Sequence, residues 1–412
     1  MNLLPALALF AGLIVAQTWP ATAAAAVTLG IDTFAEKGFP GLSGKRVGLV
    51  TNQSGVNAQG VRTSEILSRR KEFRLVALFT PEHGINGTVP AGEYVESHRD
   101  ARSGIWVHSL YGKTRKPTPA MLQGVDVLVY DLQDLGSRSY TFISTLGLVM
   151  QAAAEAGIPV YVLDRPNPLG GLRVEGGGVD PAWRTFVAQY DIPYVYGLTP
   201  AELAWWINDR WLARPCDLHV FKMGGWSRSM VWADTGLRWV PTSPNIPFAA
   251  SAWGYAATGL VGDLGITNGA KVTAYPFEVL AAENVDGALM AASLNALGLA
   301  GTRFEPLSFY PSSGKFTRVR YTGVRVRLDP RNAQTLLSVN FHALDVLRKL
   351  QPQRNFFARA QADGLAMFDK INGGPGNRVA WMRGRSAADL SRSWAPFEER
   401  WRIERKSYLL YP

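Results

Sequence analysis

The sequence predicts an α/β fold in two parts: a doubly wound parallel sheet in a large N-terminal domain, and a smaller C-terminal α+β domain. Through the first half of the chain, short runs rich in β-branched residues alternate with helical stretches. This alternation is typical of right-handed βαβ units. From about Leu294 the strands instead alternate apolar and charged residues, which indicates a sheet with one buried and one solvated face.

The elements of the N-terminal domain follow from local patterns. Four mainly apolar runs are predicted to be strands buried on both faces, at residues 46–51, 75–80, 125–130 and 160–163. Helices are expected at residues 64–71 and 143–155. A further helix should begin at the capping box Thr199-Pro200-Ala201-Glu202, where proline holds the first helical position, and end near Trp211.

The C-terminal domain is predicted from two strands and a helix. Residues 318–320 and 324–328 carry arginine at alternate positions, and a helix is expected at residues 335–350. A half-buried strand with a basic outer face accounts for these arginines, and nucleic-acid binding is the alternative. We therefore divide the chain into a signal peptide at 1–23, a domain expected to be catalytic at 24–290, and the α+β domain at 291–412.

The N-terminal segment indicates export. Residues 1–23 contain no charged side chain and end in Ala21-Thr22-Ala23, a small-x-small pattern typical of signal peptidase cleavage. An uncleaved membrane anchor is the alternative. No later segment approaches about 20 uninterrupted apolar residues, so no membrane span is expected after cleavage. The mature protein should then be periplasmic or secreted.

Composition narrows the classes of partner and cofactor. Cys216 is the only cysteine among 412 residues, which excludes an internal disulfide and a thiolate metal cluster. The chain has no HExxH, no GxxxxGK[ST] and no GxGxxG after its first strand, so we expect no metal and no cofactor. A net charge of +10 attracts nucleic acid, lipid headgroups or anionic polymers, and export favours the last two over nucleic acid. The oligomeric state is not predicted.

Polar residues follow all four predicted strands of the first domain. In a doubly wound sheet, ligands bind outside the carboxyl ends of the strands. We therefore expect the residues at these positions to converge on one site: Asn52, Gln53, Glu82, His83, Asp131, Asp134, Asp164, Arg165 and Asn167.

Glu82 is the best candidate for a catalytic acid. Hydrolysis of a glycosidic bond uses one carboxylic acid to protonate the leaving oxygen, and a second group as nucleophile, base or electrostatic partner. Leu78, Phe79 and Pro81 surround Glu82 in sequence and could desolvate it and raise its pKa. The alternative is a glutamate that caps a helix or forms a salt bridge.

Asp131 and Asp134 offer further carboxylates for catalysis. Arg138 is close enough in sequence to pair with one of them, while the other acts on the substrate. The alternative is that each aspartate caps the helix that follows. The chain has no GxSxG motif, which disfavours an α/β-hydrolase.

Together these motifs resemble the exo-β-N-acetylmuramidase (NamZ-like) family, formerly domain of unknown function 1343 and now glycoside hydrolase family 171. The matching stretches are GLVTNQSG at 48–55, PEHGINGTVPAGE at 81–93, VDVLVYDLQDLGSRSYTFISTL at 125–146, VLDRPNPLGG at 162–171 and VEGGGVDP at 174–181. The C-terminal half resembles the family more loosely, through PNIP at 244–247, YPFE at 275–278 and FDKINGG at 368–374.

The resemblance implies a Rossmann-like N-terminal domain, a cleft between the two domains, and release of N-acetylmuramic acid from the non-reducing end of peptidoglycan fragments. It also implies that Glu82 is catalytic. The lactyl carboxylate of muramic acid needs a cation, which Arg138, Arg165 or Lys271 could supply. Glu175, in the VEGGG stretch, is expected among the substrate-binding residues.

Two segments depart from the family pattern. Many relatives carry Gly-Arg-Gly-Thr where residues 268–275 are NGAKVTAY, and residues 194–197 (YVYG) lack an expected histidine. Two rival functions remain open. One is a non-catalytic periplasmic protein that binds cell-wall sugars in the same cleft. The other is an esterase or amidase of peptidoglycan, which the missing nucleophile and metal motifs disfavour.

Overall fold

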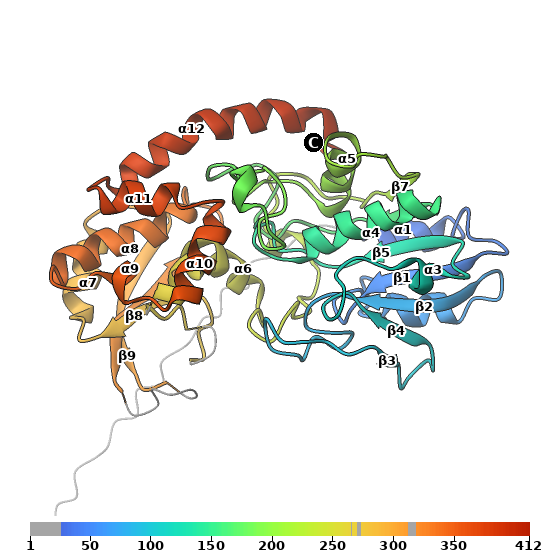
Figure 1. The fold of residues 1–412 in the computed structure, drawn as a ribbon, viewed down its shortest axis with the longest axis horizontal. Coiled ribbons are helices and arrows are strands. Elements are labelled where there is room, and N and C mark those ends of the chain that lie inside the picture. Colours follow the sequence, from blue (N-terminus) through green and yellow to red (C-terminus); the bar gives the residue numbers. More distant parts are fainter. Residues whose placement is uncertain (1–25, 265, 270–272, 312–318) are drawn as a thin grey trace, which may run out of the picture.

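The computed structural model describes residues 26–264, 266–269, 273–311 and 319–412, so the predicted signal peptide lies outside the described residues. The chain forms two lobes that lie side by side (Figure 1). The N-terminal lobe contains a seven-stranded sheet and the C-terminal lobe a three-stranded one. The predicted fold class, a doubly wound α/β domain followed by a smaller α+β domain, is confirmed.

The large sheet has the order β3-β4-β2-β1-β5-β6-β7. Its strands are β1 (Arg46–Thr51), β2 (Arg74–Thr80), β3 (His98–Arg99), β4 (Trp106–Ser109), β5 (Val127–Asp131), β6 (Val160–Leu163) and β7 (Leu218–Phe221). All neighbours pair parallel except β3 and β4, which pair antiparallel. The chain builds one half of the sheet outward from β1 and then crosses back to β5. The strand order therefore reverses between β1 and β5, which is the switch point of a Rossmann-like sheet.

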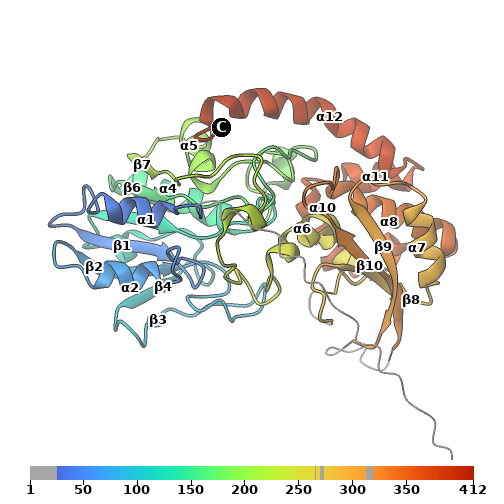
Figure 2. The same ribbon diagram turned by 180° about the vertical axis from the view of Figure 1, so that it is seen from behind.

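Helices cover both faces of this sheet. Figure 2 shows α1 (Gly30–Glu36) and α2 (Thr63–Ser68) over one face, and α4 (Phe142–Ala156) and α5 (Pro200–Arg210) lie on the other. The short α3 (Pro119–Leu122) precedes β5. The predicted capping box at Thr199 is confirmed, because the Thr199 backbone N–H donates to the Glu202 carboxylate at 3.0 Å and its hydroxyl accepts the Glu202 N–H.

The smaller sheet is antiparallel, with the order β8-β10-β9. Its strands are β8 (Val279–Glu283), β9 (Thr302–Phe309) and β10 (Tyr321–Leu328). The helices of this region are α6 (Ala249–Thr258), α7 (Gly287–Asn295), α8 (Leu337–Leu350), α9 (Phe356–Arg359), α10 (Ala362–Asn372), α11 (Gly376–Met382) and α12 (Ala387–Glu404). The predicted strand at 318–320 is wrong for the two of its residues that the structure describes. Val319 and Arg320 precede the start of β10 at Tyr321, and Arg318 lies outside the described residues.

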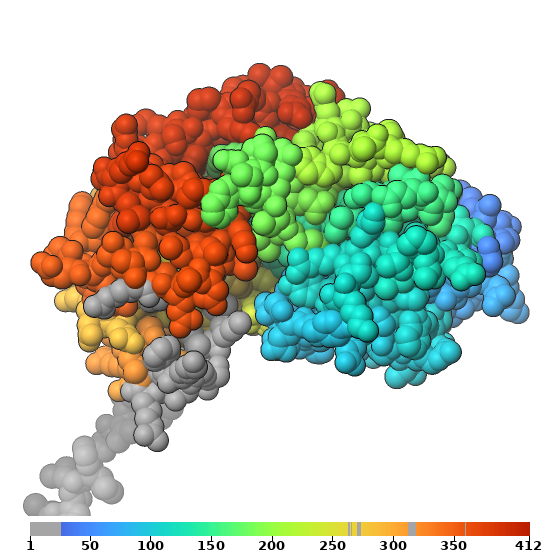
Figure 3. All heavy atoms as spheres, in the orientation of Figure 1, coloured from blue at the N-terminus to red at the C-terminus, as the bar shows by residue number. Residues whose placement is uncertain are grey.

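The last long helix ties the two lobes together. In Figures 1 and 3, α12 runs from the C-terminal lobe across the top of the molecule to the N-terminal lobe. There the Trp401 indole N–H donates to the carbonyl oxygen of Tyr196 at 2.8 Å. The buried Arg405 guanidinium donates to the Gly171 and Gly197 carbonyl oxygens at 2.9 and 2.6 Å. One hydrophobic core accordingly continues from the large sheet into α8 and α12.

Candidate active site

An open cavity of about 760 Å³ lies between the N-terminal lobe and the helices near the C-terminus; we call it the inter-domain cavity. One wall comes from the loops after β2 and β5, which contribute Glu82, His83 and Tyr140. The opposite wall is formed by residues from 360 to 371, in and before α10. The cavity thus lies beside the carboxyl edge of the parallel sheet, where this architecture binds ligands.

Glu82 lines this cavity two residues after β2 ends at Thr80. Its Oε1 accepts the backbone N–H of Gly92 at 2.8 Å, and its Oε2 accepts the Thr141 hydroxyl at 2.7 Å. Within the described ranges no cation forms an ion pair with Glu82, although the residue is only 9% exposed. The carboxylate is therefore held in place by neutral donors and still faces the cavity.

The turn that presents Glu82 has a strained backbone. His83 lies in the left-handed region with φ 72°, and its ring Nδ1 donates to the carbonyl oxygen of Val89 at 2.8 Å. Phe277, which also lines the cavity, has φ 63°. A non-glycine residue in this region costs on the order of 1 kcal/mol, and such residues cluster at functional sites. Both outliers support the cavity as the candidate active site.

Aromatic rings and hydroxyl groups complete the cavity wall. Burial, and then the charge of Glu82, raise the pKa of Tyr111 to about 12, so its phenol stays protonated and can donate a hydrogen bond. The Ser139 hydroxyl lies 2.9 Å from the Tyr255 hydroxyl, and the Tyr255 ring meets Phe277 with centroids 5.0 Å apart. A surface of rings edged with hydroxyls suits a sugar, which has apolar faces and polar edges.

The predicted catalytic Asp131 is buried away from the cavity lining. Its Oδ1 lies 2.5 Å from Arg165 Nε and its Oδ2 lies 2.9 Å from Arg165 Nη2. The Thr63 hydroxyl also donates to Oδ2, and Arg165 Nη2 donates to the Val56 carbonyl oxygen at 2.7 Å. Both side chains are almost fully buried. The pair holds the ends of β5 and β6 against the loop after β1.

Asp134 is likewise buried and does not line the cavity. Its Oδ2 accepts the Gly136 N–H at 2.7 Å and the Tyr196 hydroxyl. Its Oδ1 has no hydrogen-bond partner among the described residues. Burial raises the pKa of Asp134 to about 6, because removing the carboxylate from water destabilises its charged form.

Asp164 and Asn167 support the loop after β6. Asp164 accepts the Thr199 hydroxyl at 2.8 Å, the Ala201 N–H at 2.9 Å and the Tyr411 hydroxyl at 2.5 Å. It thereby holds the start of α5 and the end of the chain, and burial raises its pKa to about 7. Asn167 closes its own turn by accepting the Leu169 N–H at 2.9 Å.

Arg138 and Glu175, two predicted substrate-binding residues, join the lobes. Arg138 is 1% exposed and donates to the carbonyl oxygens of Ile192 at 2.5 Å and Ile371 at 3.0 Å. Burial lowers its pKa to about 10. The Glu175 carboxylate accepts the backbone N–H groups of Leu336 and Leu337 at 2.8 Å, which caps the start of α8.

Asn52 and Gln53 lie at the end of β1, outside the inter-domain cavity. The Asn52 side-chain oxygen accepts the Ser54 N–H at 2.8 Å, and the Gln53 amide donates to the Pro241 carbonyl oxygen at 2.8 Å. Lys271 lies outside the described residues. Of the predicted site residues that the structure describes, Glu82 and His83 therefore line the cavity, and the others hold the sheet edge and the lobes around it.

Both lobes match models of one protein family. The N-terminal domain model of the exo-β-N-acetylmuramidase NamZ matches residues 47–250, and the C-terminal domain model matches residues 253–411. The chain belongs to the NamZ family.

Individual proteins are similar to this chain over nearly its whole length. The peptidoglycan β-N-acetylmuramidase NamZ of Bacillus subtilis is 38% identical over 385 residues, which cover 93% of this chain and 91% of that protein. A crystal structure of a DUF1343 family protein from Bacteroides fragilis is 41% identical with a TM-score of 0.88, covering 94% of this chain and 99% of that one. A second such protein from the same organism is 26% identical with a TM-score of 0.70, covering 93% and 99%.

The segment at 194–197, which lacks the histidine expected from the resemblance, contains a buried tyrosine with a polar partner. In the segment where the resemblance leads us to expect a histidine, Tyr196 is buried and its hydroxyl donates to Asp134. Burial raises the pKa of Tyr196 well above its usual value, so it remains a donor. The segment thus makes a polar contact with the loop after β5, with a phenol as the donor.

Sequence reasoning missed several residues of the cavity. Thr141 lies within the stretch at 125–146 that carried the family resemblance, so a signal for it was present. Tyr111 and Asp363 had no such signal; Asp363, on α10, is the one other carboxylate in the described cavity lining. The described ranges contain no cluster of three metal-ligating side chains. In the same ranges, no helix combines the length and apolarity that a membrane crossing requires.

Proposed function

We propose that this NamZ family member is a glycosidase that releases N-acetylmuramic acid from the non-reducing end of peptidoglycan fragments, with Glu82 as the general acid. The family description and the Bacillus subtilis relative support the activity and the substrate class. The assignment of Glu82 as the acid rests on the position of its side chain. It is a nearly buried carboxylate with no cationic partner among the described residues, and it faces a cavity walled by aromatic and hydroxyl side chains.

The two oxygens of Glu82 have different tasks in this proposal. Gly92 presents a backbone N–H, which can only donate, so the catalytic proton belongs on Oε2. Thr141 faces Oε2 with a hydroxyl, which can accept from the protonated acid and donate to the carboxylate. The same contact therefore serves both protonation states, as an acid that delivers and regains a proton requires.

In this proposal the substrate itself supplies the nucleophile that attacks the anomeric carbon. Asp363 is exposed, and its Oδ1 already accepts the Gly364 N–H at 2.9 Å, which fits an acidic residue in the first turn of a helix. The 2-acetamido oxygen of N-acetylmuramic acid can attack the anomeric carbon from within the sugar, as in other substrate-assisted glycosidases. Water then opens the cyclic intermediate, and the β configuration is retained.

Two acid-to-amide variants test this assignment on a β-glycoside of N-acetylmuramic acid whose leaving group is a second sugar. We expect Glu82→Gln to lower kcat/KM by at least about a hundredfold, and Asp363→Asn by less than about threefold. NMR of the first-formed product should show the β anomer. An α anomer, together with an equally large loss in Asp363→Asn, would make Asp363 the base of an inverting enzyme.

The same assay separates the rival binding function. A non-catalytic sugar-binding protein would bind the glycoside without turnover in the wild-type chain, so turnover lost in Glu82→Gln with binding retained excludes it. We further propose that residues 1–23 direct export to the periplasm or the medium. Cell fractionation with and without these residues tests that proposal, and equal distribution of both forms would contradict it.

A further inference from the structure

A second pocket, of about 320 Å³, lies at the switch point of the large sheet; we call it the switch-point pocket. It is lined by Gln53 after β1, Gln133 after β5 and Arg165 after β6, and is closed by the segment from Trp232 to Pro241. Its described lining shares no residue with the inter-domain cavity. The Gln53 amide donates to the Pro241 carbonyl oxygen at 2.8 Å, and this contact closes the pocket on one side.

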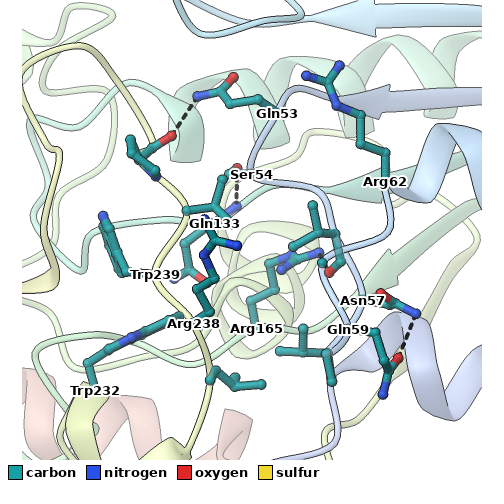
Figure 4. Close-up of a pocket in the computed structure, with 17 residues that line it drawn as sticks. Gln53, Ser54, Asn57, Gln59, Arg62, Gln133, Arg165, Trp232, Arg238 and Trp239 are labelled. Carbon is teal, nitrogen blue, oxygen red and sulfur yellow. Dashed lines mark hydrogen bonds between the residues drawn. The ribbon is translucent and has the colours of Figure 1, made fainter.

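The switch-point pocket has a surplus of positive charge. Three arginines and no carboxylate occur in its described lining. Arg165 is neutralised by its ion pair with Asp131, and Arg62 donates to the Asn86 side-chain oxygen at 3.2 Å. Arg238 makes neither a hydrogen bond nor an ion pair within the described part of the chain. Figure 4 shows Arg238 reaching into the pocket beside Gln133 and Arg165. An anionic group can therefore enter without displacing an internal partner.

A buried acceptor in the same pocket lacks a donor. Gln133 is 3% exposed, and its amide nitrogen donates to the carbonyl oxygens of Asp134 at 2.9 Å and Pro166 at 2.8 Å. These two bonds fix the orientation of the amide, and its oxygen has no partner among the described residues. The Gln53 side-chain oxygen is also unpartnered. Because a buried acceptor without a donor destabilises the folded chain, it points to a ligand that supplies a donor.

The third feature of the pocket is a pair of indole rings. Trp232 and Trp239 meet edge to face, with ring centroids 4.7 Å apart. The Trp239 indole N–H is bonded to the Ile246 carbonyl oxygen at 3.1 Å, so this ring is held at the pocket wall. Such rings offer flat apolar surfaces of the kind on which sugar rings pack.

We propose that the switch-point pocket binds an acidic saccharide, whose carboxylate pairs with Arg238, whose hydroxyl or amide N–H donates to Gln133, and whose ring lies against Trp239. This binding site is separate from the candidate active site and does not depend on the role of Glu82. It would allow the protein to hold an anionic glycan at a second point.

Fluorine NMR of protein labelled with 5-fluorotryptophan tests this binding directly. The Trp232 and Trp239 signals are assigned with the variants Trp232→Phe and Trp239→Phe. The probes are free N-acetylmuramic acid and N-acetylglucosamine, which differ by the lactyl carboxylate. We expect N-acetylmuramic acid to shift both signals in a saturable manner, and N-acetylglucosamine at equal concentration to leave them in place.

Matched variants locate the site and its charge. Arg238→Gln should raise the apparent Kd for N-acetylmuramic acid by at least about tenfold. Arg303→Gln removes the same charge from an exposed position on β9 and should leave the Kd unchanged. Glu82→Gln should leave the two shifts unchanged, which separates this pocket from the inter-domain cavity. Absent shifts, equal shifts with both sugars, or equal weakening in Arg303→Gln would each overturn the proposal.

Discussion

Three aspartates and one glutamate lie at the carboxyl ends of strands in the large sheet, and the surroundings of the aspartates differ from those of the glutamate. Asp131, Asp134 and Asp164 are buried, and each is bound to groups of the N-terminal lobe or the chain end. Glu82 follows β2 in the same way, but its donors are neutral groups, among them the Gly92 N–H and the Thr141 hydroxyl, and it lines the inter-domain cavity. A position after a strand therefore does not by itself bring a carboxylate to the cavity. Of these four carboxylates, Glu82 is the one that lines the cavity, and among the described residues no cation pairs with it.

The largest effect that follows from this comparison concerns stability rather than turnover. Asp131→Ala leaves the Arg165 guanidinium buried without its counter-charge, and we expect a loss of about 3–5 kcal/mol in the free energy of unfolding. Urea denaturation measures this loss. Asp126→Asn, which breaks the exposed pair with Arg46, should leave the unfolding midpoint unchanged. A stable Asp131→Ala variant with abolished turnover would instead place Asp131 in the catalytic set.

A smaller effect should appear in the pH dependence of stability. The pKa of Asp134 is raised from 3.8 to about 6 in the folded chain, so the folded state binds its proton more tightly than the unfolded state does. The stabilisation that this proton gives to the folded state is full below about pH 4 and is lost as the pH rises through about 6, by on the order of 3 kcal/mol.

Asp134→Asn provides the control for that prediction. The variant cannot titrate, so the free energy of unfolding should fall less between pH 4 and pH 7 than in the wild-type chain. Denaturation series at several pH values measure the difference. Parallel curves for the two proteins would show that Asp134 titrates equally in both states.

The smallest predicted effect concerns the bridge between the lobes. Trp401→Phe removes the indole N–H that donates to Tyr196, and we expect a loss of about 1 kcal/mol, the usual contribution of a buried hydrogen bond. Trp106→Phe, at an exposed position on β4, is the matched substitution and should cost less. If both variants lose the same free energy of unfolding, the hydrogen bond from Trp401 does not help to join the lobes.

Local patterns predicted the N-terminal sheet because its strands are buried on both faces and carry few polar residues. The strands at 46–51 and 160–163 match β1 and β6, and the strand at 75–80 misses β2 by one residue. The strands β7 and β8 and the long helix α12 were not predicted. β7 contains His219 within four residues, and α12 carries Pro396 in its interior, so their local signals are weak.

The candidate site was predicted in part for a similar reason. Glu82 and His83 follow a clear strand, and the switch from apolar to polar residues marks them. The same signal also selected Asp131. Sequence alone cannot show that Asp131 forms an ion pair with Arg165, which lies 34 residues later in the chain. Asp363 could not be found at all, since the opposite wall of the cavity depends on how the second lobe packs.

The most direct test of the central claim, that Glu82 protonates the leaving group, compares two substrates in Glu82→Gln. One is a muramic acid disaccharide, whose sugar leaving group needs a proton. The other is a 2,4-dinitrophenyl glycoside of N-acetylmuramic acid, whose leaving group departs without one. We predict a loss in kcat/KM of at least about a hundredfold on the disaccharide, and a loss at least about tenfold smaller on the dinitrophenyl glycoside. Equal losses on both substrates would contradict the assignment of Glu82 as the acid.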